Sequence, residues 1–255
     1  MKLNFHVLGN GPPLIILHGL LGSLDNWIPL ASTLAVDCSV FVLDLRNHGR
    51  SPHANEFDYE VMAADVADFI RDHNLGPVKL LGHSMGGKTA MRFAQLHPDS
   101  VEKLVVADMA PRAYPPHHAA LLDALLALDL KSFRRRDEMD VALAATVPEK
   151  TMRQFLLKNL GRDATGAFCW KPNLRAIREN YPGLNAALPA GRRYAGPTMF
   201  VRGGESAYVT DADFTDARGS FPQAELRTIA GAGHWVHADA PADFARILRD
   251  FLMPG

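Results

Sequence analysis

Short runs of apolar residues recur along the chain, and helical patterns separate them. The runs are rich in Leu, Ile and Val and cover residues 14–17, 40–43, 78–81, 104–107 and 198–201. Each has the length and composition of a strand that is buried on both faces. Residues 61–73 and 88–97 have the apolar spacing of helices. Because strands and helices alternate, the sequence predicts an α/β fold with a mostly parallel central sheet and helices on both faces.

The alternation stops after Asp108, where about ninety residues precede the next strand pattern. Within this stretch, residues 119–130 and 151–160 have the clearest helical patterns. A helical insertion between two strands of one sheet is expected to lie over their carboxyl ends, where it shapes a pocket. We therefore expect one core domain in two pieces, residues 1–110 and 192–255, and a helical cap of residues 111–191.

The charges of the chain almost balance, with 27 Lys and Arg residues, 28 Asp and Glu residues and a formal net charge of −1. The chain therefore lacks the basic excess of a nucleic-acid binder, and 47% apolar residues are too many for a disordered chain. No apolar run approaches the roughly 18 residues of a membrane span. We expect a cytoplasmic protein, a monomer or small homo-oligomer, that acts on a small-molecule substrate.

Metal and cofactor motifs are not apparent. Cys38 and Cys169 form no Cys-x-x-Cys pair, and the chain contains neither His-Glu-x-x-His nor Gly-x-Gly-x-x-Gly. Asp44, Arg46 and His48 lie in a loop after a predicted strand, where such residues usually bond backbone groups. We therefore expect that the protein uses no metal and no cofactor.

Residues 81–89 read Leu-Gly-His-Ser-Met-Gly-Gly-Lys-Thr and lie between a predicted strand and a predicted helix. One interpretation is a nucleophile elbow, Gly82-x-Ser84-x-Gly86, in which the glycines permit a tight turn that exposes the serine hydroxyl. The other is a P-loop, whose amides bind phosphates and whose final Lys-Thr pair contacts phosphate and Mg²⁺. The same residues thus predict either a hydrolase or a nucleotide-binding protein.

Two other segments favour the elbow. A hydrolase of this kind has an oxyanion loop after an earlier strand and a histidine late in the chain. Residues 18–22, His-Gly-Leu-Leu-Gly, follow an earlier strand pattern, and residues 231–234, Gly-Ala-Gly-His, lie near the end. The P-loop interpretation explains neither segment, although Asp44 and Asp108 are available as magnesium ligands. It stays an alternative that magnesium-dependent nucleotide binding would test.

Four blocks in this order resemble the α/β-hydrolase superfamily over nearly the whole chain, namely residues 18–22, 44–51, 82–88 and 231–237. Residues 108–111, Asp-Met-Ala-Pro, and 203–209, Gly-Gly-Glu-Ser-Ala-Tyr-Val, are similar more closely to the small YbfF-type esterases. This resemblance implies an α/β-hydrolase fold and activity on short acyl esters and acyl thioesters.

Acyl transfer needs a nucleophile, a base, a carboxylate that orients the base, and two donors for the oxyanion. The resemblance implies that Ser84 is the nucleophile and His234 the base. Four other histidines compete for the role of base and are expected to form local hydrogen bonds instead, namely His18, His48, His83 and His237.

The oxyanion is expected to bind backbone amides, because backbone donors require no particular side chain. The amide after the nucleophile belongs to Met85, and the second donor is expected to be the amide of Leu20. Leu21 is the alternative for this second donor.

The carboxylate of the triad has several candidates, because Ala207 stands at the position that the superfamily usually uses. Asp108 directly follows the predicted strand 104–107, so its carboxylate emerges at the same sheet edge as Ser84. Esterases that resemble this chain also place their acid there. The competing carboxylates are Glu205, Asp211 and Asp213.

Apolar side chains near these positions are expected to line an acyl pocket. The candidates for binding substrate are His83, Met109, Trp170 and Trp235, with Phe155, Phe168 and Tyr208 as further candidates. Together these residues predict hydrolysis of a carboxylic ester or acyl thioester through a Ser-His-Asp triad and an acyl-enzyme. The alternatives are carbon-carbon bond hydrolysis on the same fold, a P-loop protein, or a binding module without turnover.

Overall fold

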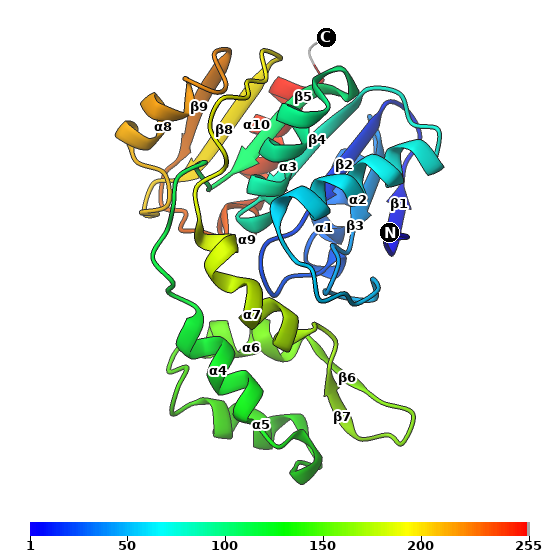
Figure 1. The fold of residues 1–255 in the computed structure, drawn as a ribbon, viewed down its shortest axis with the longest axis vertical. Helices are drawn as coiled ribbons and strands as arrows, with labels where there is room; N and C mark the ends of the chain where they lie inside the picture. Colours follow the sequence, from blue (N-terminus) through cyan, green and yellow to red (C-terminus); the bar gives the residue numbers. More distant parts are fainter. Residues whose placement is uncertain (254–255) are drawn as a thin grey trace.

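A seven-stranded sheet forms the centre of the computed structural model, which describes residues 1–253 (Figure 1). The strands in sheet order are β1 (Phe5–Leu8), β3 (Ser39–Leu43), β2 (Pro13–Leu17), β4 (Val78–His83), β5 (Val101–Ala107), β8 (Thr198–Gly203) and β9 (Ala224–Ile229). Only the pair β1 and β3 is antiparallel among these neighbours. The mostly parallel sheet confirms the predicted fold class, and the five predicted strands are β2, β3, β4, β5 and β8.

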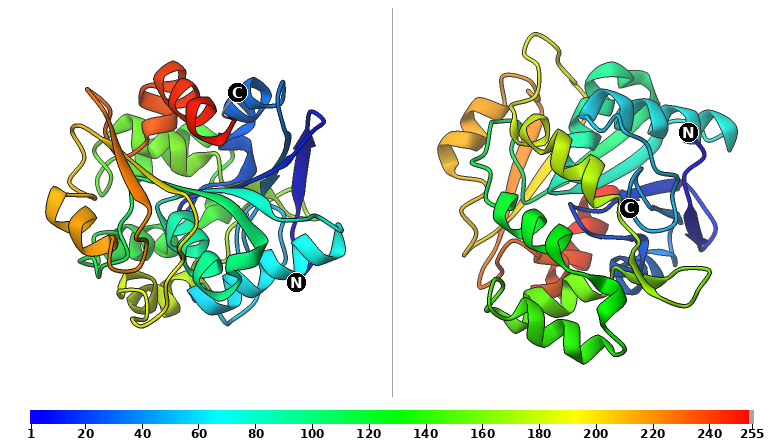
Figure 2. Two further views of the ribbon diagram at one scale, coloured as in Figure 1. Left: turned by 90° about the horizontal axis from the view of Figure 1, so that it is seen from above. Right: turned by 60° about the horizontal axis from the view of Figure 1, so that its bottom comes forward.

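Helices cover both faces of this sheet (Figure 2). One face carries α2 (Tyr59–Asp72), α3 (Met85–Leu96) and α8 (Asp211–Ala217), and the other carries α1 (Ile28–Leu34) and α10 (Pro241–Leu252). Each face has its own hydrophobic core. Side chains alternate between the two faces along each strand, so Ile15 and Leu17 pack in the core under α2 and α3, while Leu14 and Ile16 pack in the core under α1 and α10. None of the helices within residues 1–253 is long and apolar enough to span a membrane.

The residues between β5 and β8 form a separate group of elements at one end of the molecule (Figure 1). They comprise α4 (Ala119–Ala127), α5 (Arg136–Leu143), α6 (Lys150–Leu157), α7 (Leu174–Asn185) and a hairpin of β6 (Leu160–Arg162) and β7 (Phe168–Trp170). The helix predicted for 151–160 ends earlier, because Leu160 begins β6 instead. The insertion is therefore helical with one hairpin that the sequence pattern did not predict.

Hydrogen bonds fasten this insertion to the loops at the carboxyl ends of the strands. The Tyr59 hydroxyl of α2 donates to the Leu184 carbonyl of α7 at 2.7 Å. The Asn159 side-chain amide donates to the carbonyl of Leu21, in the loop after β2, also at 2.7 Å. These bonds hold the inserted helices over the edge of the sheet where β4 and β5 end.

Candidate active site

Ser84 lies in the sharp turn between β4 and α3. Its backbone has φ 52° and ψ −119°, a conformation that costs a non-glycine residue free energy. The turn is tight because a Cβ on Gly82 would overlap the Gly86 carbonyl, and a Cβ on Gly86 would overlap the Leu17 carbonyl. The glycines on either side of Ser84 therefore let α3 pack directly against β2 and β4, and the serine projects from the sheet edge.

Asp108 immediately follows β5, beside Ser84 on the neighbouring strand. Its N–H donates to the Val201 carbonyl at 2.7 Å, and the Ser84 N–H donates to the Ala107 carbonyl at 3.1 Å. Like Ser84, Asp108 has a left-handed backbone, with φ 48°, and its side chain is completely buried. The turn directs the carboxylate toward the loops that follow β8 and β9.

His234, in the loop after β9, meets the Asp108 carboxylate. Its Nδ1 donates to Asp108 Oδ2 at 2.7 Å. The Gly203 N–H donates to the other carboxylate oxygen at 3.2 Å, and the Ser206 hydroxyl donates to Oδ2. The carboxylate is thus held by three donors and fixes the ring of His234. The role of Ser206 has no signal in the sequence, because it depends on how the loop after β8 folds back.

The competing carboxylates lie elsewhere. Glu205 is exposed, and its N–H donates to the Ala232 carbonyl at 3.0 Å. Asp211 pairs with Arg202 at 2.8 Å, and Asp213 pairs with Arg112 at 2.7 Å. None of the three contacts His234 within the described residues, so Asp108 is the carboxylate that the fold brings to this histidine.

Aromatic rings surround His234. The Tyr208 ring stacks on the imidazole with 3.8 Å between centroids and 18° between planes. The His83 Nε2 donates to the His234 carbonyl at 2.8 Å, and burial, together with the neighbouring histidines, holds the pKa of His83 well below its usual value. His83 is therefore neutral and restrains the backbone of His234.

His18 and His48 hold the loop after β2 in place. The His48 Nε2 accepts the Leu21 N–H at 3.1 Å, and the His18 Nε2 accepts the Leu45 N–H at 3.0 Å. Burial, with the nearby His18, lowers the pKa of His48 to about 3, so the ring stays neutral and can accept. Because the Leu21 N–H already has an acceptor, Leu20 is the better placed of the two candidate donors in this loop.

The amides of Leu20 and Met85 have no acceptor among residues 1–253. Met85 is the first residue of α3, where an N–H has no intrahelical partner. The Leu20 N–H forms no hydrogen bond within residues 1–253. Both residues line a pocket that Ser84 also lines, so both amides are available to a ligand there.

Two pockets meet at Ser84. We call the first the His234 pocket; its lining includes His83, His234, Trp235, Phe155, Trp27 and Leu121. We call the second the Lys88 pocket; its lining includes Lys88, Met85, Met109, Tyr59, Tyr114 and Tyr208. Leu20 and His118 line both. The sequence pattern did not predict His118, Tyr59 or Tyr114, because their place depends on how the insertion packs over the sheet.

The structure places His83 and Trp235 in the His234 pocket and Met109 in the Lys88 pocket. The prediction for Trp170 disagrees with the structure, since its indole N–H donates to the Leu125 carbonyl at 3.1 Å and the residue lines neither pocket. Phe168 also lies outside both pockets, under the Arg162 guanidinium at 4.1 Å. Both belong to β7 of the hairpin.

The P-loop interpretation does not agree with this geometry. Lys88 and Thr89 are buried within α3, where the Thr89 hydroxyl donates to the Met85 carbonyl at 3.0 Å and the Lys88 ammonium donates to the Ala186 carbonyl at 2.6 Å. Neither side chain points to a loop that could surround a phosphate. Asp44 accepts the N–H groups of Leu24 and Arg50, at 2.8 and 2.9 Å, as expected for a loop residue.

Comparisons with known proteins agree with the fold. A family model described as the alpha/beta hydrolase fold matches residues 12–241. The sn-1-specific diacylglycerol lipase ABHD11 of Mus musculus is 39% identical, covering 94% of this chain and 81% of that protein. Esterase YbfF of Escherichia coli is 35% identical, covering 99% of both chains. This relative confirms the resemblance to YbfF-type esterases.

A solved structure, named as a marine microorganism esterase, superposes on this chain with a TM-score of 0.96. It is 42% identical and covers 98% of this chain and 99% of its own. The similarity to this esterase therefore extends over the whole sheet and the insertion. The chain belongs to the α/β-hydrolase family.

Proposed function

We propose that the protein is a serine hydrolase that cleaves carboxylic esters through a triad of Ser84, His234 and Asp108. The observation that carries this proposal is the strained serine at the sheet edge, which shares a pocket with a histidine paired to a buried carboxylate. The names of the relatives, esterase and diacylglycerol lipase, support cleavage of an ester bond.

In this mechanism His234 Nε2 removes the Ser84 proton as the serine oxygen attacks the acyl carbon. The Leu20 and Met85 amides donate to the oxyanion of the tetrahedral intermediate. His234 then protonates the leaving oxygen, and the acyl group stays on Ser84. Water, activated by the same histidine, hydrolyses this acyl-enzyme, while Asp108 keeps the imidazole in the tautomer that accepts at Nε2.

Acyl thioesters are a second substrate class for the same groups. A thiolate is a good leaving group, and the acyl-enzyme that forms is the same as with an ester. The relatives' names favour oxygen esters, so we place these first. Carbon-carbon bond hydrolysis would use the same triad. A binding module without turnover would not need the strained backbone at Ser84.

We also propose that residues 111–191 act as a cap that sets specificity. Their helices supply residues to both pockets at Ser84, including Phe155 and Leu121 in one and Tyr181 and Leu184 in the other. The core would then supply the reacting groups, and the cap would determine which acyl and alcohol groups fit.

The test is a panel of p-nitrophenyl esters and acyl-CoAs of graded chain length, assayed with the wild type and Ser84→Ala. We expect ester hydrolysis that falls by about 10⁴-fold or more in the variant, because the nucleophile is lost. A serine-directed fluorophosphonate should label the wild type only.

Ser32→Ala is the matched control, since Ser32 is an exposed serine of α1 whose hydroxyl bonds the Ile28 carbonyl. It should keep full activity and full labelling. Activity that survives in Ser84→Ala, or a wild type that hydrolyses no member of the panel, would refute the proposed function.

A further inference from the structure

Lys88 is a buried lysine, and lysine is rarely buried completely in protein interiors. It lies one helical turn after Ser84 in α3, and its side chain is completely buried. The ammonium donates to the Ala186 carbonyl at 2.6 Å and lies 5.6 Å from the ring centre of Tyr59 and 5.0 Å from that of Tyr114. A carbonyl and two aromatic faces are its partners, and the proposed mechanism does not use it.

The charge of Lys88 has no counterion in the part of the chain that the structure describes. Other largely buried cations do have one: Arg46 pairs with Asp65 at 2.6 Å, and Arg153 pairs with Asp140 at 2.9 Å. No carboxylate lies within 4.0 Å of the Lys88 ammonium among residues 1–253. Burying an unpaired charge costs several kcal/mol by the general rule, so such a charge is retained where something offsets the cost.

Burial, with repulsion from Arg112, lowers the pKa of Lys88 to about 8. The ammonium therefore keeps its proton at neutral pH. Arg112 offers no positive charge to a ligand, because its guanidinium is already paired with Asp213 at 2.7 Å. Lys88 is thus the residue that gives this pocket its charge.

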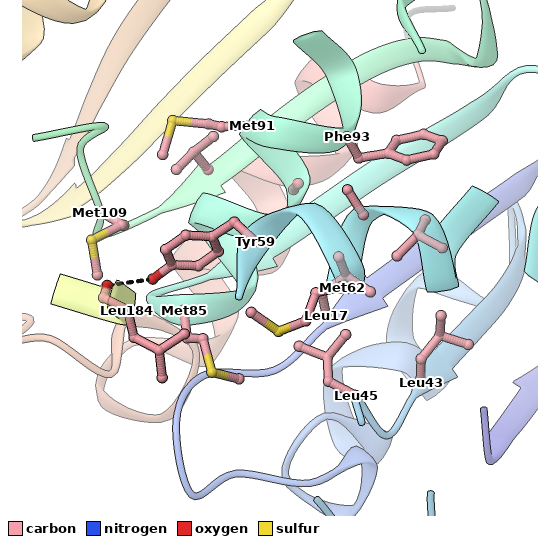
Figure 3. Packing of buried hydrophobic residues seen from close by; sticks show 14 of the residues in the cluster. Leu17, Leu43, Leu45, Tyr59, Met62, Met85, Met91, Phe93, Met109 and Leu184 are labelled. Atoms are coloured by element: carbon pink, nitrogen blue, oxygen red, sulfur yellow. Dashed lines mark hydrogen bonds between the residues drawn. The ribbon is translucent and has the colours of Figure 1, made fainter. Parts of the chain in front are cut away.

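Lys88 is the one Lys or Arg among the described residues that line this pocket, and two histidines, His117 and His118, also line it. Figure 3 shows part of its wall, where Tyr59, Met85, Met109 and Leu184 come together and the Tyr59 hydroxyl bonds the Leu184 carbonyl. No Asp or Glu of residues 1–253 lines it, and burial lowers the pKa of His118 to about 4, so that ring is neutral. An apolar, aromatic pocket with one buried cation is suited to a ligand that is apolar along its length and negative at its end.

The geometry also indicates which part of the substrate enters this pocket. His234 must protonate the leaving oxygen, and it lines the His234 pocket but not the Lys88 pocket. The alcohol therefore lies on the His234 side, and the acyl chain extends toward Lys88. Lys88 lies in the first turn of α3, with its N–H bonded to the Ser84 carbonyl at 3.1 Å, so a short acyl chain on Ser84 enters the pocket that Lys88 lines.

We propose that the Lys88 pocket is an acyl subsite that selects short acyl groups ending in a carboxylate, as in the half-esters of dicarboxylic acids. This inference rests on the proposed function and adds a substrate class to it. The carboxylate would accept the free N–H bonds of the Lys88 ammonium and supply a counterion that residues 1–253 do not provide there.

The test compares two methyl esters of matched shape. Monomethyl glutarate ends in a carboxylate, and methyl 5-methylhexanoate ends in an isopropyl group. We expect the wild type to show a kcat/KM at least about tenfold higher for the carboxylate. Lys88→Met keeps the length of the side chain without its charge and should lower this preference about 10- to 100-fold. The wild-type preference is measured without any variant, so it does not depend on how Lys88→Met folds.

Lys79→Met is the matched control. Lys79 is also a buried lysine, but it lies at the start of β4 and is 3.8 Å from Glu102, so the preference should not change. A second pair, 4-acetoxybutanoate and 4-methylpentyl acetate, carries the same two end groups on the alcohol side. Their ratio should not respond to Lys88→Met.

Three results would overturn the inference. The first is a wild type that prefers the isopropyl ester. The second is a Lys88→Met variant that slows both methyl esters equally, and the third is a Lys88→Met variant in which only the ratio of the two acetates changes. An equal effect on both methyl esters would mean that Lys88 only ties α3 to the Ala186 carbonyl. A wild type that hydrolyses none of the four esters would instead refute the proposed function itself.

Discussion

At the scale of single residues, the site depends on backbone conformations that are rare for side chains of these types. Ser84 and Asp108 both have positive φ, at 52° and 48°, and both follow directly on the last residue of a strand. The strand patterns in the sequence indicate where β5 ends, whereas β4 runs to His83, two residues beyond the predicted strand. They do not indicate that Asp108 turns its carboxylate to His234, because that direction depends on three donors from distant loops.

The exchange of Asp108 for Asn tests the triad at this scale. An asparagine has nearly the same shape but stabilises the wrong tautomer of His234, so kcat should fall by about 10⁴-fold. Glu205→Gln is the matched control, since Glu205 is the exposed candidate, and it should change kcat by less than about threefold. Steady-state kinetics on one p-nitrophenyl ester measures both variants, and a large loss in Glu205→Gln alone would contradict the assignment.

Some residues of the site could be predicted and others could not, for a physical reason. Ser84, His234 and Leu20 lie in short segments whose turn residues are recognisable in the sequence. Trp170 was expected at the site from its residue type alone, and the hairpin carries it away. Which cap residues reach the pockets depends on packing between distant segments, and periodicity holds no information about that packing.

At the scale of secondary-structure elements, the close contact between α3 and β2 is the feature that positions the nucleophile. Gly86→Ala would place a methyl group against the backbone carbonyl of Leu17, which cannot move without shifting the strand. We expect this variant to lower the free energy of unfolding by about 2–4 kcal/mol. Urea denaturation followed by circular dichroism measures the change.

Gly183→Ala is the control for that experiment. Gly183 lies inside α7, and a Cβ there would meet no atom within 4 Å. The same substitution should therefore leave stability unchanged or raise it by about 0.5–1 kcal/mol. Equal losses at the two glycines would show that helix α3 can move away from β2 at little cost.

Burial also explains which elements the sequence predicted. The strands β2 and β4 and the second half of β5 are largely buried and appear as short runs rich in apolar residues. The edge strands β1 and β9 are half-exposed and carry mixed sequences, so they were missed. The hairpin was missed because its strands have three residues each, too few for an alternation to be recognised.

At the scale of the whole molecule, three buried histidines link folding to pH. Burial lowers the pKa of His18, holds that of His83 well below its usual value and lowers that of His48 to about 3. In the unfolded chain these rings have a pKa of about 6.5. Between these values the unfolded chain binds more protons than the folded one, so stability is complete above pH 6.5 and falls as the pH drops toward 4.

We expect His48, whose pKa in the folded protein is about 3, to remove about 2 kcal/mol from the free energy of unfolding between pH 7.5 and pH 5. Urea denaturation at pH 7.5 and pH 5.0 measures the loss. His48→Gln cannot titrate, so its loss between the two pH values should be about 2 kcal/mol smaller than that of the wild type. His6→Gln changes an exposed histidine and should show the wild-type loss; an equal loss in His48→Gln would contradict the prediction.

The backbone bonds from Ser84 to Ala107 and from Asp108 to Val201 extend the ladders of neighbouring strands past their ends. The lengths of β4 and β5 therefore determine the separation between the nucleophile and its acid. Apolar side chains within β4 and β5 can be exchanged for others of similar volume at modest cost. One residue inserted into β5 would turn the next side chain to the opposite face of the sheet. The two strands therefore tolerate exchanges among apolar side chains of similar volume, whereas a change in their length would misplace Ser84 or Asp108.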